Sequence, residues 1–261
     1  MNQIDLTGIE ESKKPIFFCS FGKDSSAVLH ALKPWLYKTM VVFIDCGGAF
    51  PDVVEWADEA GAKLPHYFHI HPTNDIWKEI RSKGWSVDME FADLGRHSDT
   101  IRQVAVAGRH KTRPWTQCVY ERLWIPGFVF TQMYKPDLYI SGEKKSDRPY
   151  ANDWETRTNG IANSLRPVFN WTDDEVWEYI DENKIELPVA YNHRDADRRD
   201  CYLCFGAGLT VNRIKFLKEQ YPDLYNKVFH EEGFAELVPV MVDQLKKAFE
   251  VWSDIQGLIR G

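Results

Sequence analysis

Short runs of apolar, β-branched and aromatic residues alternate along this chain with longer segments of helical spacing. Four such runs lie at residues 15–19, 40–45, 66–71 and 137–141. Runs of this length, separated by helical patterns, are typical of parallel strands joined by crossover helices. The sequence therefore predicts an α/β fold: an open, twisted, mostly parallel sheet, which we expect to have five strands, with helices on both faces.

The first apolar run is followed directly by a short polar loop and then by a helical pattern. The apolar residues 27–32 predict a helix that ends before Pro34. A strand, a loop and a helix in this order direct backbone N–H groups and the positive end of a helix dipole at an anion. The alternative is an ordinary serine-rich helix cap. This candidate phosphate loop consists of Ser20, Phe21, Gly22, Lys23, Asp24, Ser25 and Ser26.

The second run ends in a turn that we expect at the same edge of the sheet. Asp45 and Cys46 precede Gly47 and Gly48, and paired glycines permit a tight turn before a helix over residues 52–62. Ligands of open parallel sheets bind outside the carboxyl ends of the strands. The phosphate loop and this turn are therefore expected to border one crevice.

The remaining patterns suggest two parts. Residues 98–134 are mainly helical in pattern, with a break at residues 111–114, and residues 172–175 form a capping box that predicts a helix start. We expect a nucleotide-binding domain at residues 1–170. Residues 171–261 are expected to form a helical C-terminal region, which carries the Cys201-x-x-Cys204 loop and packs on the first domain.

Composition excludes several classes of protein. The chain has 27% charged residues and no apolar run near the roughly eighteen residues that cross a bilayer, and its first residues lack a secretion-signal pattern. We therefore expect a cytoplasmic protein without membrane partners. Separately, we expect a homo-oligomer. The formal charge of −7 argues against a broad nucleic-acid surface, so a direct nucleic-acid substrate stays open but has no support from the charge.

Six short motifs follow one another along the chain. Residues 20–26 read S-F-G-K-D-S-S, residues 45–52 read D-C-G-G-A-F-P-D, and residues 166–172 read R-P-V-F-N-W-T. Three further segments lie at residues 113–118, 141–148 and 199–204. Together the motifs resemble those of the phosphoadenosine phosphosulfate (PAPS) reductase family of the PP-loop superfamily, which also includes ATP pyrophosphatases. Cys46 stands where that family usually has threonine.

This resemblance implies chemistry on an adenine nucleotide, either ATP or a sulfonucleotide such as PAPS or adenosine phosphosulfate (APS). The retained Lys23 and Asp24 favour ATP, with attack at the α-phosphate and release of pyrophosphate. Lys23, Asp24 and Asp45 are the implied catalytic residues, and Asp24 or Asp45 is the implied Mg²⁺ ligand. The implied nucleotide-binding residues outside the phosphate loop are Asp45, Gly47, Gly142, Lys144, Arg148 and Arg199.

Five cysteines, an odd number, suit metal or redox chemistry better than a disulfide framework. The resemblance to thiolating PP-loop enzymes implies that Cys118, Cys201 and Cys204 hold a [4Fe–4S] cluster with one iron left free for sulfur. Zinc, with His193 as a fourth ligand, is the alternative. A further alternative is that Cys118 is a buried apolar residue and that the cysteine pair binds nothing.

Three functions remain open at this stage. An ATP pyrophosphatase would pass its adenylated acceptor to a sulfur donor. A PAPS or APS reductase would release sulfite with a thioredoxin-like partner, although residues 205–261 contain no cysteine to act as the expected nucleophile. The third is a non-catalytic nucleotide-binding subunit of a sulfur-transfer or defence complex.

Overall fold

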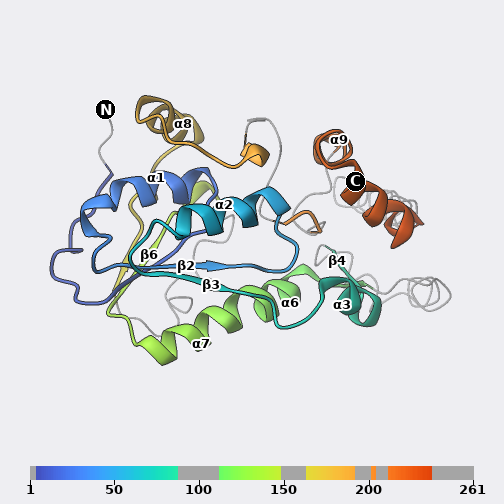
Figure 1. Ribbon diagram of the computed structural model, residues 1–261, viewed down its shortest axis with the longest axis horizontal. Helices are drawn as coiled ribbons and strands as arrows, with labels where there is room; N and C mark the ends of the chain where they lie inside the picture. The colour runs from blue at the N-terminus through green and yellow to red at the C-terminus, as the bar shows by residue number, and fades with distance from the viewer. Residues whose placement is uncertain (1–3, 88–111, 148–162, 192–200, 204–210, 237–261) are drawn as a thin grey trace, which may run out of the picture. The chain divides into compact units, whose positions relative to one another are not determined.

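The computed structural model of the chain describes residues 4–87, 112–147, 163–191, 201–203 and 211–236 (Figure 1). The chain forms two compact units. Unit 1 comprises Met1–Asp75 and Val119–Tyr202, and unit 2 comprises Ile76–Cys118 and Leu203–Gly261. The domain boundary near residue 170 stays a prediction. Within the described part of the chain, no helix is both long enough and apolar enough to span a membrane.

Unit 1 is built around a five-stranded sheet, which confirms the expected α/β fold. Its strands lie in the order β3-β2-β1-β6-β7, and each neighbouring pair is parallel. Four of them coincide with the four apolar runs, and the fifth is a short edge strand. The strands are β1 (Pro15–Phe18), β2 (Met40–Ile44), β3 (Tyr67–Ile70), β6 (Leu138–Ser141) and β7 (Ser164–Leu165).

The strand order reverses beside β1, and this reversal positions the candidate site. β1 leads through α1 (Lys23–Ala31) to β2, and β2 leads through α2 (Pro51–Gly61) to β3, so the sheet first grows to one side. β6 and β7 extend it on the other side of β1. Ligands of such sheets bind at the carboxyl ends of the strands where the order reverses. The loops after β1 and β6 are therefore neighbours at the place where a ligand is expected.

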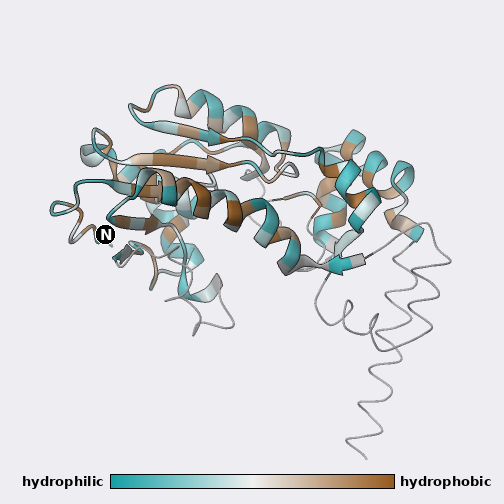
Figure 2. Ribbon diagram, turned by 90° about the horizontal axis from the view of Figure 1, so that it is seen from below, coloured by the Kyte–Doolittle hydropathy of each residue, from teal (hydrophilic) through white to brown (hydrophobic). Residues whose placement is uncertain are grey.

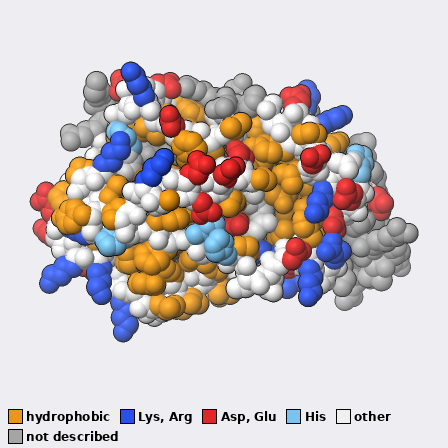
Figure 3. Space-filling view, in the orientation of Figure 1, with side chains coloured by type: hydrophobic (Ala, Val, Ile, Leu, Met, Phe, Trp, Pro, Cys, Tyr) orange, Lys and Arg blue, Asp and Glu red, His pale blue; other side chains and the backbone are white. Residues whose placement is uncertain are grey.

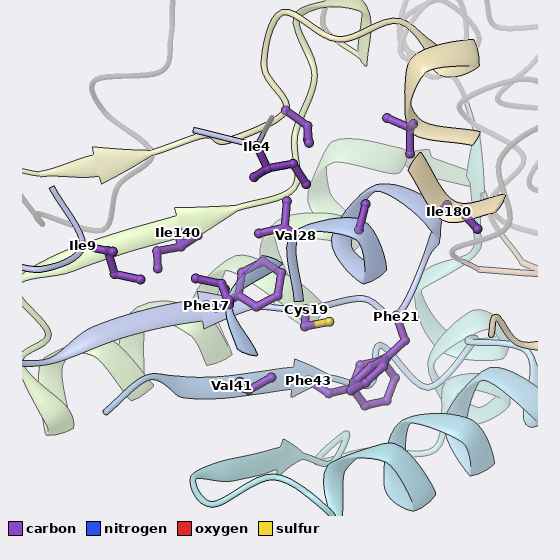
Figure 4. Close-up of a cluster of buried hydrophobic side chains, with 14 of the residues drawn as sticks. Ile4, Ile9, Phe17, Cys19, Phe21, Val28, Val41, Phe43, Ile140 and Ile180 are labelled. Carbon is purple, nitrogen blue, oxygen red and sulfur yellow. The ribbon is translucent and has the colours of Figure 1, made fainter. Parts of the chain in front are cut away.

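One face of the sheet is covered by α1 and α2 (Figure 1). Phe17 and Val41 point into this core and meet Val28 of α1 (Figure 4). Val176 of α8 (Asp173–Glu182) belongs to the same cluster, because α8 packs on α1. Apolar side chains on facing elements thus bury one another and hold α1 rigidly over the sheet.

The opposite face of the sheet is covered by α7 (Ile125–Tyr134). Ile16 and Val42, which alternate with the residues of the first core, pack there with Phe130. Figure 2 shows that the strands and the α7 helix beside them carry many apolar residues. The described part of unit 1 also contains four short helical turns: η1 (Lys33–Trp35), η2 (Tyr120–Trp124), η3 (Lys145–Asp147) and η5 (Val189–Tyr191).

Unit 2 contains a second, two-stranded parallel sheet that the sequence patterns did not predict. β4 (Trp85–Val87) pairs with β5 (Thr112–Pro114), so the expected break in the helical pattern at residues 111–114 contains a strand. Glu79 and Arg113 form a buried ion pair with 2.7 Å between Oε1 and Nη1. Among the described residues of this unit, the helices are α3 (Ile76–Lys83), α6 (Trp115–Val119), α9 (Val211–Gln220), α10 (Pro222–Asn226) and η6 (Lys227–Glu231).

Candidate phosphate site

Helix α1 begins at Lys23, four residues before the start expected from the apolar pattern. Gly22 is its N-cap, and the amide of Ser26 donates to the carbonyl oxygen of Gly22 at 2.8 Å as the first intrahelical bond. In an α-helix the amides that precede this bond have no intrahelical acceptor. The amides of Lys23, Asp24 and Ser25 therefore remain for an anion at the positive end of the helix dipole.

Phe21 has an uncommon backbone conformation, and its side chain anchors the loop. Its φ is +56°, which costs a bulky residue roughly 1–3 kcal/mol. Its ring is buried and makes edge contacts with Phe43 and Tyr67, at centroid distances of 5.8 and 6.2 Å. The buried ring thus anchors the loop in the core, and only the backbone of Phe21 is left for a ligand.

Two glycines allow other elements to approach the start of α1. A Cβ on Gly142, in the loop after β6, would lie 2.8 Å from the backbone N and Cα of Ser25. A Cβ on Gly22 would lie 2.6 Å from the hydroxyl of Tyr191. The overlap at Gly142 is with backbone, so glycine is required there, whereas the overlap at Gly22 is with the end of the Tyr191 side chain, which would have to shift.

Four charged side chains meet at this turn. Nζ of Lys23 lies 2.8 and 2.9 Å from the two carboxylate oxygens of Asp24 and 2.5 Å from Oδ1 of Asp173. Nζ of Lys144 lies 2.7 Å from Oδ1 of Asp24 and 3.2 Å from Oδ1 of Asp173. The Lys144 side chain is only 1% exposed. Two lysines from different strand ends thus converge beside the free amides of α1.

Asp173 is a site residue that the sequence reasoning did not select. It is the first residue of α8, whose start is held by the expected capping box: Thr172 Oγ1 accepts from the amide of Glu175, and Glu175 accepts from the amide of Thr172. The hydrogen bond from Lys23 lowers the pKa of Asp173, and the charge of Lys144 adds to this effect. The capping box predicts where α8 begins. It does not predict that this helix start contacts Lys23 and Lys144.

The turn after β2 lies at the neighbouring strand end. Oδ1 of Asp45 accepts from the amide of Gly47 at 2.7 Å, and Gly47 has a φ of +79° that favours glycine. The buried Arg122 donates from Nη1 to the carbonyl oxygen of Cys46 at 2.8 Å. Arg122 lies on the π-helical turn η2 and was also missed by sequence reasoning. It fixes the turn that presents Asp45.

The cysteines have different environments. Cys19 is buried, and burial raises the pKa of its thiol to about 12, so the thiol is unreactive at neutral pH. Cys46 and Cys201 are half-buried. The amide of Tyr202 donates to the carbonyl oxygen of Gly48 at 2.8 Å, which ties the Cys201 segment to the turn after Cys46. The pKa of Tyr202 is raised by burial first, and then by the charges of Cys201 and Cys46.

Several expected site residues are not brought together by the described structure. Arg148, Arg199 and Cys204 lie outside the described residues, as does His193. Cys118 belongs to unit 2 and Cys201 to unit 1. Among the described residues, no three His, Cys, Asp or Glu side chains are grouped closely enough to hold a metal ion. The cluster at Cys118, Cys201 and Cys204 therefore stays a prediction.

The histidines near β3 have protein partners. Nδ1 of His69 lies 2.7 Å from Oδ1 of Asp58, and Nε2 of His66 lies 2.9 Å from the carbonyl oxygen of Tyr37. Figure 3 shows acidic side chains gathered beside histidines on the face where α2 and β3 lie. One ring nitrogen of each of these two histidines is thus paired locally.

The sheet order and this site define a class of protein: a doubly wound α/β protein with a candidate anion site at the carboxyl edge of its parallel sheet. A sequence model of the phosphoadenosine phosphosulfate reductase domain matches residues 14–194. The chain belongs to this family, as its motifs indicated.

Curated relatives share low identity with the chain. It is 21% identical over 243 residues to an uncharacterised protein of Methanocaldococcus jannaschii, which covers 90% of this chain and 51% of that protein. It is 23% identical over 207 residues to sulfate adenylyltransferase subunit 2 of Burkholderia lata, covering 70% of this chain and 62% of the relative. The chain thus spans about half to three fifths of the length of these relatives.

Two solved structures are similar to the chain. One is a PAPS reductase from Candida auris in complex with phosphate, at a TM-score of 0.41 and 16% identity, covering 67% of this chain and 75% of that one. The other is the U34-tRNA thiolase NcsA from Methanococcus maripaludis with its [4Fe-4S] cluster, at a TM-score of 0.43 and 11% identity, covering 88% and 74%.

Proposed function

We propose that this chain is an enzyme that binds ATP with the phosphate groups at the start of α1. The observation that carries the proposal is the convergence of Lys23 and the buried Lys144 on the carboxylate of Asp24, in the first turn of α1. Charge-assisted hydrogen bonds from ammonium groups to phosphate are about twice as strong as neutral ones, and the helix N-terminus adds its dipole. The family match is the independent support for an adenine nucleotide.

The reaction that we propose is attack of an acceptor oxygen on the α-phosphate. The new bond forms between that oxygen and phosphorus, the bond from the α-phosphorus to its bridging oxygen breaks, and pyrophosphate leaves with the electron pair. Lys23 is placed to stabilise the charge that develops on the leaving group. Asp24 keeps both lysines oriented in this arrangement.

Mg²⁺, when bound, would neutralise part of the pyrophosphate charge. Asp45 fits this ion better than Asp24, because both oxygens of Asp24 already accept from Lys23. One oxygen of Asp45 accepts from the Gly47 amide, which orients the carboxylate at the strand end. We therefore assign Asp45 as the Mg²⁺ ligand.

We further propose that the adenylated acceptor receives sulfur through a group held by Cys118, Cys201 and Cys204. The attachment of the Cys201 segment to the Gly48 turn supports this, since it brings one of these cysteines near the Asp45 strand end. The group is a [4Fe–4S] cluster, with zinc as the alternative. Iron, sulfide and zinc analysis of protein purified without oxygen distinguishes the two. Stoichiometric zinc without iron would contradict the proposal of a [4Fe–4S] cluster.

A second candidate function is favoured by the family itself: reduction of PAPS or APS with release of sulfite. Calorimetry with ATP and with PAPS, and assays of pyrophosphate and sulfite, separate the two. The proposal predicts ATP binding and pyrophosphate release that depends on an added acceptor and not on thioredoxin. Sulfite production from PAPS would identify a reductase instead. Nucleotide binding without turnover under any of these conditions would identify a non-catalytic subunit.

A further inference from the structure

Asp173 contacts both lysines of the candidate phosphate site, although it lies 150 residues after Lys23 in the chain. Its Oδ1 is 2.5 Å from Nζ of Lys23 and 3.2 Å from Nζ of Lys144. Asp24 contacts the same two ammonium groups from the other side. Two positive and two negative charges therefore compensate one another before any phosphate arrives.

The two carboxylates are held differently. Asp24 lies in the first turn of α1, its side chain is 23% exposed, and both of its oxygens accept from Lys23. The Asp173 side chain is 66% exposed. Rotation about its Cα–Cβ bond would carry the carboxylate into water while α8 keeps its start, because the capping box uses Thr172 and Glu175. Asp173 is thus the carboxylate that is able to leave.

The position of Asp173 Oδ1 is also where a phosphoryl oxygen would contact both lysines. The carboxylate and a phosphate group carry the same sign of charge and need the same donors, so they compete for this position. When the position has no phosphate, the carboxylate compensates the charge of Lys144, which is too buried to be hydrated well. The contact therefore stabilises the free protein and opposes ligand binding.

We propose that Asp173 is an internal counter-ion that an incoming di- or triphosphate displaces from Lys23 and Lys144. This inference rests on the proposed function, because it requires a polyphosphate at the start of α1. Its consequence is weaker binding and faster loss of pyrophosphate after the reaction, since the carboxylate returns to the lysines as the product leaves. Product release limits turnover in many enzymes.

The test is calorimetry of the full chain with inorganic pyrophosphate and with ATP. Asp173→Asn keeps the size of the side chain and removes its charge. We expect about fivefold tighter binding of pyrophosphate, because phosphate no longer has to displace a carboxylate from the two lysines, and the exposure of Asp173 keeps the effect small. Asp174→Asn is the matched control on the same exposed turn of α8, and its affinity should stay within about twofold of wild type. Asp173→Glu, which keeps the charge, should bind like wild type.

The outcomes separate this inference from the proposed function. Unchanged or weaker binding by Asp173→Asn, with wild type binding normally, would overturn the inference alone. An equal gain in pyrophosphate affinity for Asp174→Asn would also overturn it, because the effect would then come from the general surface charge. If neither wild type nor any variant with an intact thermal transition binds pyrophosphate or ATP, both the proposed function and this inference fail.

Discussion

Nζ of Lys144 lies 2.7 Å from Oδ1 of Asp24, although the two residues are 120 positions apart in the chain. The contact joins the loop after β6 to the first turn of α1, across the point where the strand order reverses. Both loops reach this point because β1 and β6 are adjacent and parallel, with Phe18 paired with Ser141. The sheet order thereby places a buried cation beside the free amides of a helix start.

Loss of Lys144 should weaken nucleotide binding strongly. In Lys144→Ala we expect at least tenfold weaker ATP binding, because a desolvated charged partner is lost from the site. Lys145→Ala is the control, since the Lys145 side chain is exposed and its contact with Phe169 is made by the backbone amide. Calorimetry of both variants checks this. Equal ATP affinities of the two variants would show that Lys144 does not contribute to nucleotide binding.

Gly142→Ala should destabilise the protein and disturb the site. The added methyl group would meet the backbone of Ser25 at 2.8 Å, and relief of this overlap is expected to cost about 1–3 kcal/mol of unfolding free energy. Gly127→Ala in α7 is the contrast, because its nearest neighbour would be Ile44 at an ordinary 3.4 Å and alanine favours the helix by about 0.5–1 kcal/mol. Denaturant unfolding measures both. A Gly142→Ala protein as stable as wild type would contradict the close approach.

The contact between Gly22 and Tyr191 predicts coupling between two substitutions. Gly22→Ala should cost up to about 1 kcal/mol, because its Cβ would lie 2.6 Å from the Tyr191 hydroxyl and the end of that side chain would have to shift. The cost should be smaller in a Tyr191→Phe background, where that hydroxyl is missing. A double-mutant cycle of unfolding free energies measures the coupling. Additive effects would show that the two residues do not meet.

Cys19 should make stability depend on alkaline pH. Its pKa is raised from 9.0 to about 12 by burial, so above pH 9 the unfolded chain loses this proton and the folded protein keeps it. Stability from this group is complete below pH 9 and falls as pH rises towards 12, by up to about 1.4 kcal/mol per pH unit. Cys19→Ala should show a shallower decline than wild type in unfolding experiments between pH 8 and about 10.5. Equal slopes of unfolding free energy against pH for the two proteins would show that the Cys19 thiol is exposed to solvent in the folded state.

The sheet and the order of strand, loop and helix at residues 15–31 were predictable from the sequence because their signals are local, while the binding of phosphate there stays a prediction. Apolar runs predicted β1, β2, β3 and β6, and the order of strand, loop and helix predicted an anion site after β1. The start of α1 was placed four residues late, because Lys23 to Ser26 are polar and were read as loop. In the structure these residues form the first helical turn, which is what aims their amides outward.

The missed residues depend on contacts between distant parts of the chain. Asp173 is recognisable locally as the first residue of a capped helix, but its pairing with Lys23 follows only from the packing of α8 on α1. Arg122 follows Glu121 in a stretch of mixed polarity that gives it no distinguishing signal, and the π-helical turn directs it to the carbonyl oxygen of Cys46. No sequence periodicity encodes such contacts.

The most direct test of the account is a crystal structure of the full chain with a non-hydrolysable ATP analogue. The account predicts phosphate oxygens within hydrogen-bond distance of the amides of Lys23, Asp24 and Ser25, with Lys23 and Lys144 at the phosphate chain. An analogue bound elsewhere, or bound with its phosphates in solvent and the four charged side chains still paired with one another, would contradict it.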